Sequence, residues 1–133
     1  MKKRIGILFA VVMAVTMLCG ISVYAVEARY IYATSATSTL TKQNSSVTCT
    51  STAQGNSTVT KIAATQYLEK KDGDNWEVVK GCKWSSSTES AYLYASNSKS
   101  SLGSGTYRLR TVFTVYSGTS SETIEKTSSE VTI

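Results

Sequence analysis

The segment from Leu102 to Tyr116 constrains the possible folds of this chain more than any other segment. After the turn Gly103-Ser104-Gly105, the residues alternate in character until a second breaker at Ser117-Gly118. One side of the alternation holds Tyr107, Leu109, Thr111, Phe113 and Val115, and the other holds Arg108, Arg110, Val112, Thr114 and Tyr116. β-Branched and aromatic residues with a period of two predict a strand, and its apolar side requires a facing sheet.

Six further segments have strand-like patterns, and turn residues separate them about every ten positions. We expect these strands within 27–41, 46–53, 59–70, 76–80, 91–95 and 122–133. In the third segment Ile62, Ala64 and Leu68 share one side with Gln66 among them, and Asp72-Gly73 then predicts a hairpin turn. No amphipathic helix follows the first 25 residues. The pattern therefore predicts an all-β fold, a single antiparallel sandwich of about seven strands.

Serine and threonine make up more than a third of the residues from position 26 onward. Such a composition is also typical of disordered segments. Here the threonines alternate with Val, Ile, Tyr and Leu, which favours half-buried strands. Disorder stays open for parts of 34–41 and 85–90.

Residues 1–25 have the features of a signal peptide. Lys2, Lys3 and Arg4 precede an apolar run from Ile5 to about Ile21, and Val23-Tyr24-Ala25 fits a cleavage site. We expect cleavage after Ala25, with cleavage after Ala28 and a permanent membrane anchor as the alternatives. The prediction is therefore a secreted, extracellular protein whose residues 26–133 form the sandwich domain.

Cleavage would lower the net charge of the chain. Of 14 Lys and Arg residues, three belong to the leader, so eleven (14 − 3) face nine acids. Nucleic-acid binding needs a concentrated basic face, so we expect no nucleic-acid partner. Arg108 and Arg110 share one strand face, which we interpret as a solvated surface. Contact with a membrane is expected only through the signal peptide before cleavage.

Two cysteines, Cys49 and Cys82, follow the leader. In an exported protein an even pair predicts a disulfide bond. The alternative is a pair of buried free thiols. Because the chain has no histidine, two cysteines are too few for a metal site. We expect no metal and no cofactor.

The absence of histidine also removes the usual acid–base and triad arrangements, so we expect no catalytic residues and no enzyme activity. Tyr92 and Tyr94 share one strand face, as do Tyr30 and Tyr32. Adjacent tyrosines can stack on sugar rings or anchor a protein partner, although packing inside the domain is the alternative. The predicted function is a non-catalytic binding or adhesion module for an unknown protein or glycan ligand. A small secreted toxin or bacteriocin-like effector is the alternative.

The segment Leu102–Arg110 resembles the penultimate strand of fibronectin type III and related immunoglobulin-like domains, and Tyr67–Trp76 resembles their central hairpin. The resemblance implies that Tyr107 is the corner tyrosine whose hydroxyl bonds back to the main chain. The chain departs from the pattern because no proline precedes Tyr107 and because Trp84 lies outside the cysteine pair. As a whole the chain also resembles a family of small secreted proteins from Gram-positive bacteria. The first resemblance implies an immunoglobulin-like sandwich for residues 26–133 but no binding site. The second implies export and fold but no activity.

Overall fold

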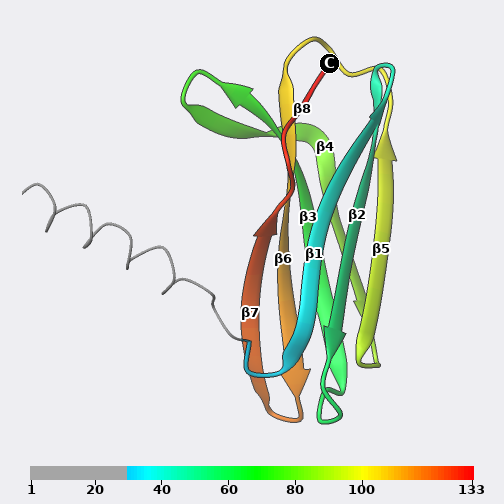
Figure 1. Ribbon diagram of the computed structural model, residues 1–133, viewed down its shortest axis with the longest axis vertical. Coiled ribbons are helices and arrows are strands. Elements are labelled where there is room, and N and C mark those ends of the chain that lie inside the picture. Colours follow the sequence, from blue (N-terminus) through cyan, green and yellow to red (C-terminus); the bar gives the residue numbers. More distant parts are fainter. Residues whose placement is uncertain (1–29) are drawn as a thin grey trace, which may run out of the picture.

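The computed structural model describes residues 30–133. The predicted signal peptide and both predicted cleavage sites lie outside the described residues. Within the described range the chain forms strands and no helix (Figure 1). The strands are β1 (Ala33–Gln43), β2 (Ser46–Gly55), β3 (Lys61–Asp72), β4 (Asn75–Thr88), β5 (Tyr92–Lys99), β6 (Thr106–Ser117), β7 (Ser120–Thr127) and β8 (Val131–Thr132).

The strands form two antiparallel sheets that pack face to face (Figure 1). One sheet has three strands in the order β1-β2-β5. The other has the order β4-β3-β6-β7, and the short β8 pairs with β6. The chain passes between the sheets three times, after β2, after β4 and after β5, as in immunoglobulin-like sandwiches. The predicted all-β sandwich is confirmed.

Strand β6 is the alternating segment that the sequence singles out. It pairs with β3 on one edge and with β7 and β8 on the other, so it lies inside the five-stranded sheet. Its inward residues, from Tyr107 to Val115 at every second position, are buried, and its outward residues are half-buried. The period of two thus corresponds to one face in the core and one face toward solvent.

Two strands, β4 and β5, are longer than their sequence patterns indicate, and β5 continues from the predicted 91–95 to Lys99. The predicted strand at 76–80 is too short, because β4 continues to Thr88 and pairs with β3 along residues 83–88. The register shifts between Tyr67 and Glu69, and Gly81 opposite this point has a φ of 79°. An irregularity of this kind bends a strand without ending it. Residues 34–41 and 85–88, for which the sequence left disorder as an alternative, therefore lie in strands β1 and β4.

The core between the sheets contains two apolar clusters, and every residue of both lies within 30–133. The cluster near the β6–β7 turn contains Ala33, Ala53, Val59, Ile62, Ala64, Leu93, Ala95, Phe113, Val115 and Ile124. The cluster near the β1–β2 turn contains Leu40, Val47, Cys49, Leu68, Cys82, Leu102, Tyr107 and Leu109. Full burial of a large apolar side chain such as Phe113 contributes about 1.5–3 kcal/mol. Residues 30–133 thus contain the apolar core that stabilises the folded domain.

A layer of polar side chains separates the two clusters, and we call it the polar layer. It consists of Ser38, Ser51, Gln66, Asn97 and Thr111, each from a different strand. Gln66 Nε2 donates to Ser51 Oγ at 2.8 Å, and Asn97 Nδ2 donates to Gln66 Oε1 at 2.6 Å. Ser51 Oγ lies 2.7 Å from Thr111 Oγ1, which lies 3.0 Å from Ser38 Oγ. These bonds join the two sheets through the interior.

Candidate binding face

The outer face of the three-stranded sheet carries two of the tyrosines that the sequence singles out. Tyr92 and Tyr94 lie on β5, which is an edge strand. Leu93 between them is buried in the core, so both rings point away from it. The tyrosines are 54% and 60% exposed. Residues two apart on a strand are separated by roughly 6.6 Å, so the two rings lie side by side.

The rest of this face consists of uncharged polar side chains. Tyr94 lies opposite Thr52 on β2, which in turn lies opposite Thr37 on β1. Two further rows repeat this pattern with threonine or serine in all three strands. These rows are Thr39, Thr50 and Ser96, and Thr41, Thr48 and Ser98. The outward positions of the three strands therefore present hydroxyl and amide groups and no formal charge; we call this the threonine–tyrosine face.

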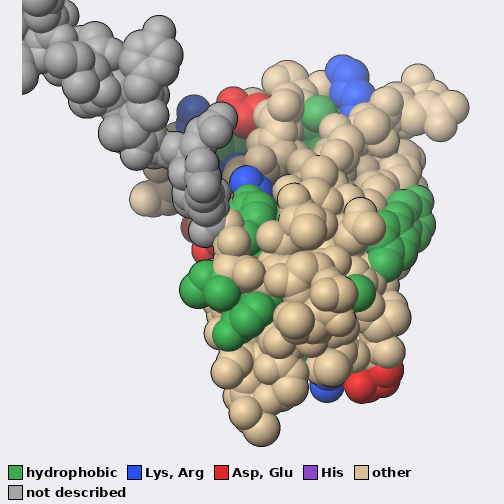
Figure 2. Space-filling view, turned by 60° about the horizontal axis from the view of Figure 1, so that its bottom comes forward, with side chains coloured by type: hydrophobic (Ala, Val, Ile, Leu, Met, Phe, Trp, Pro, Cys, Tyr) green, Lys and Arg blue, Asp and Glu red, His purple; other side chains and the backbone are tan. Residues whose placement is uncertain are grey.

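Figure 2 shows the same character in the space-filling view. Most of the visible surface is uncharged polar side chain and backbone, and hydrophobic side chains form small separate patches. One patch lies on the right side, where β5 lies in Figure 1. Charged side chains are few on this side of the molecule.

Tyr30 and Tyr32 lie elsewhere. Both are partly buried and pack against the apolar cluster near the β6–β7 turn. The structure therefore places them in packing contacts and does not bring them together with Tyr92 and Tyr94. Among the predicted contact residues, Tyr92 and Tyr94 are the two with their rings in solvent.

A carboxylate on β7 fixes the chain before β1. The backbone N–H groups of Ile31, Tyr32 and Ala33 donate to Glu122 at 2.8, 2.7 and 2.8 Å. Partial burial raises the pKa of Glu122, but the three backbone hydrogen bonds outweigh it and hold the pKa below its ordinary value. This carboxylate is thus occupied by the main chain.

The outer face of the five-stranded sheet carries a stack of cations and aromatic rings. Arg108 and Arg110 lie with their guanidinium carbons 4.2 Å from the ring centres of Trp76 and Tyr67, respectively. Glu69 lies between them and accepts from Arg108 Nε at 2.9 Å and Arg110 Nε at 3.2 Å. The side chain of Glu69 is only 6% exposed. The two arginines are therefore held in place, and the interpretation of a merely solvated pair was incomplete.

The two cysteines are free thiols in the structure, which differs from the predicted disulfide. Both are buried in the cluster near the β1–β2 turn, Cys49 on one sheet and Cys82 on the other. The pKa of Cys49 is raised to about 12, mainly by burial and to a smaller extent by the neighbouring Cys82. Burial also raises the pKa of Cys82, and nearby Lys99 opposes that effect. Thiols in this state react slowly, because the thiolate is the reactive form.

Tyr107 has the geometry that the family resemblance implies for a corner tyrosine. Its ring is buried at the start of β6, and its hydroxyl donates to the carbonyl oxygen of Gly103 at 2.7 Å. The bond ties the β5–β6 loop to the strand that follows it. This role is structural, because the hydroxyl has its partner inside the chain.

Comparisons of the chain with protein-family models, with curated proteins and with solved structures give no match. Within residues 30–133 there is no helix of the length and apolarity that crossing a membrane requires. In the same range no three potential metal-ligating side chains are grouped together. The function must therefore be argued from the described surfaces.

Proposed function

We propose that this protein is a secreted, non-catalytic binding module, and that it binds a glycan on the threonine–tyrosine face. The observation that carries the proposal is the exposure of Tyr92 and Tyr94 side by side on β5. Adjacent exposed apolar groups with a polar rim are typical of interaction sites. Nothing in the fold of β5 requires large rings at these positions, because Leu93 and Ala95 provide its contribution to the core.

The chemistry of the face favours a glycan over a charged ligand. A tyrosine ring offers an apolar surface to the C–H face of a sugar and a hydroxyl at its edge. The neighbouring threonines and serines both donate and accept hydrogen bonds, as sugar hydroxyls require. The outward positions of β1, β2 and β5 carry no formal charge. A neutral polysaccharide or oligosaccharide matches this combination of exposed rings, hydroxyl groups and uncharged positions.

The engagement of the acidic side chains supports a non-catalytic role. Glu69 is bound by two arginines, and Glu122 is bound by three backbone N–H groups. Asp72 and Asp74 lie in and beside the tight β3–β4 turn. Glycoside hydrolysis needs two carboxyl groups facing one bond at about 5–10 Å. None of these four acids belongs to the threonine–tyrosine face.

Export is part of the proposal and rests on residues 1–25. In an oxidising compartment Cys49 and Cys82, which lie in one cluster, would pair during folding, before burial lowers their reactivity. The loop of 33 residues (82 − 49) would then stabilise the fold by about 3–4 kcal/mol in the chain-entropy model. Mass spectrometry of unreduced protein from the culture medium should show both thiols blocked and a start at residue 26 or 29. Two alkylatable thiols would refute the pairing.

The binding proposal is tested with residues 26–133 on a glycan array and in sedimentation with insoluble polysaccharides. We expect retention on at least one neutral glycan, and loss of it in Tyr92→Ala and Tyr94→Ala. Tyr116→Ala, on the outer face of the other sheet, is the matched control and should bind normally. Circular dichroism must show that all variants are folded. Equal binding by the Tyr92 and Tyr94 variants, or capture of proteins and no glycan, would refute the proposal.

A further inference from the structure

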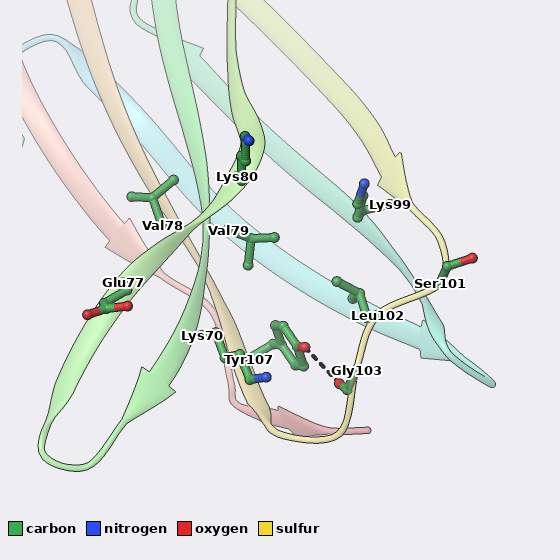
Figure 3. A pocket seen from close by; sticks show the side chains of 10 residues that line it. All are labelled: Lys70, Glu77, Val78, Val79, Lys80, Lys99, Ser101, Leu102, Gly103 and Tyr107. Atoms are coloured by element: carbon green, nitrogen blue, oxygen red, sulfur yellow. Dashed lines mark hydrogen bonds between the residues drawn. The ribbon is translucent and has the colours of Figure 1, made fainter.

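A second candidate site lies at the end of the sandwich near the β1–β2 turn, away from Tyr92 and Tyr94 at the start of β5. It is a cavity of about 500 Å³ between the β3–β4 hairpin and the loop from β5 to β6 (Figure 3). Small-molecule sites typically have volumes of roughly 300–1,000 Å³, so the cavity has room for a small ligand. No sequence pattern indicates this cavity, because its residues come from four separate segments.

The cavity has an apolar floor and a cationic rim. Figure 3 shows Val79, Leu102 and Tyr107 turned toward its centre. Three lysines line it as well: Lys70 from β3, Lys80 from β4 and Lys99 at the end of β5. A ligand in this cavity would meet apolar groups below and ammonium groups around its edge.

The lysines of the rim are not neutralised inside the described part of the chain. None of the three forms an ion pair there; the ion pairs found in residues 30–133 use Lys61, Arg108 and Arg110. Glu77 is the only acid that lines the cavity, and Figure 3 shows it on the hairpin, well apart from Lys99. Three ammonium groups and one carboxylate give the lining a formal charge of +2 (3 − 1). Unneutralised charge of one sign around a cavity attracts ligands of the other sign.

The turn before β6 places one of these lysines. The ammonium group of Lys70 lies 5.7 Å from the ring centre of Tyr107. Its stem crosses Gly105, where an added Cβ would lie 2.6 Å from Lys70 Cε. Gly105 also has a φ of 156°, which side-chain-bearing residues rarely adopt. The side chain of Lys70 therefore packs against Gly103, Gly105 and the ring of Tyr107. The Tyr107 hydroxyl in turn donates a hydrogen bond to the carbonyl oxygen of Gly103.

We propose that this cavity binds a phosphate ester carried on a small polyol or sugar. A phosphate monoester has a charge of about −1.5 to −2 at neutral pH, which matches the +2 of the lining. Lysine binds phosphate as a point charge from several directions, which suits ammonium groups that come from three different strands. Val79, Leu102 and Tyr107 would contact the carbon skeleton. The site is independent of the threonine–tyrosine face, so either proposal can fail alone.

The test is an NMR titration of ¹⁵N-labelled residues 26–133 with four probes: inorganic phosphate, glycerol 3-phosphate, glucose 6-phosphate and glucuronate. We expect saturable shifts at the backbone amides of residues 101–103 with both esters, and weaker shifts with glucuronate. Inorganic phosphate separates the contribution of the anion from that of the polyol. Glycerol and glucose without phosphate are the neutral controls and should cause no shift at these amides. Added salt should weaken binding of the esters.

Three substitutions locate the site: Lys70→Gln, Lys80→Gln and Lys99→Gln. Each should weaken ester binding about tenfold, the loss expected for one charge-assisted hydrogen bond. Lys71→Gln is the matched control, because Lys71 is adjacent in sequence but does not line the cavity. The proposal is overturned if Lys71→Gln weakens binding as much as the other variants, if glucose and its phosphate shift the same amides equally, or if no probe shifts residues 101–103.

Discussion

Gln66→Leu tests whether the polar layer stabilises the sandwich. Gln66 is 1% exposed, and its side chain bonds from β3 to β2 and β5 of the facing sheet, beside the links that Thr111 makes. Leucine has a similar size and suits the apolar clusters on either side. It has no group that can bond to Ser51, Asn97 or the carbonyl oxygen of Cys49. The substitution therefore removes the hydrogen bonds with little change in shape.

The expected loss of stability follows from the bonds of Gln66. Its side chain makes bonds of 2.6, 2.8 and 3.2 Å to Asn97, Ser51 and the carbonyl of Cys49, and a longer one of 3.4 Å to the carbonyl of Ala95. At about 1 kcal/mol net for each of the three shorter bonds, the loss is about 3 kcal/mol. Greater apolar burial by leucine offsets about 1 kcal/mol. We therefore expect Gln66→Leu to lower the free energy of unfolding by about 2 kcal/mol, or roughly 8–16 °C in Tm.

Urea denaturation of residues 26–133 followed by tryptophan fluorescence measures the change. Gln54→Leu, an exposed position on β2, is the control and should stay within about 0.5 kcal/mol of the parent. Adding Ser51→Ala to Gln66→Leu should cost less than the sum of the two single changes, because the second change removes a partner that the first leaves unsatisfied. A Gln66→Leu protein as stable as the parent would refute the reasoning, since burial of the glutamine would then cost as much as its bonds contribute.

Three further changes probe the structure. Because the pKa of Glu122 is lower in the folded chain, the stability it contributes is present above its unfolded pKa and is lost as the pH falls through the folded value. The Tm of the parent should thus fall more steeply than that of Glu122→Gln between about pH 5 and pH 3 in a thermal scan. Glu69→Gln should cost about 1–3 kcal/mol in urea denaturation, because two arginines lose a buried partner, while exposed Glu125→Gln should cost almost nothing. Tyr107→Phe removes the bond to Gly103 and should cost about 0.5–1.5 kcal/mol in the same assay; an unchanged midpoint would show that the corner bond does not stabilise the fold.

The fold was predictable because most strands alternate cleanly. In β2, β3 and β6 the inward positions recur at a period of two and are mostly apolar, and Gly73 with a φ of 61° forms the hairpin turn expected at Asp72-Gly73. The second half of β4 was missed for a physical reason. It is an edge strand, so its Ser85–Thr88 segment needs few apolar residues, and its serines resemble those of a loop.

The polar layer was visible in the sequence only as isolated exceptions. Ser51, Gln66 and Thr111 each interrupt an otherwise apolar face. The pairing of Gln66 with Thr111 across β3 and β6 follows from the strand register, and the contact with Ser51 follows from the packing of the sheets. Neither is set by local sequence. The same is true of the arginine stack, since Glu69 and Arg108 are 39 residues apart.

The orientation of Tyr92 and Tyr94 depends on the volumes of residues on both sheets. On the inner side, β5 contributes Leu93 and Ala95, and neighbouring β2 contributes Ala53. Leu93 and the two small alanines pack in one cluster with Phe113 and Ile62 of the other sheet, which fill the space between the layers. Two inward tyrosines would add far more volume than a close-packed core accepts. The sequence of β5 alone permits either orientation, whereas the facing sheet permits only the one that leaves both rings exposed to solvent.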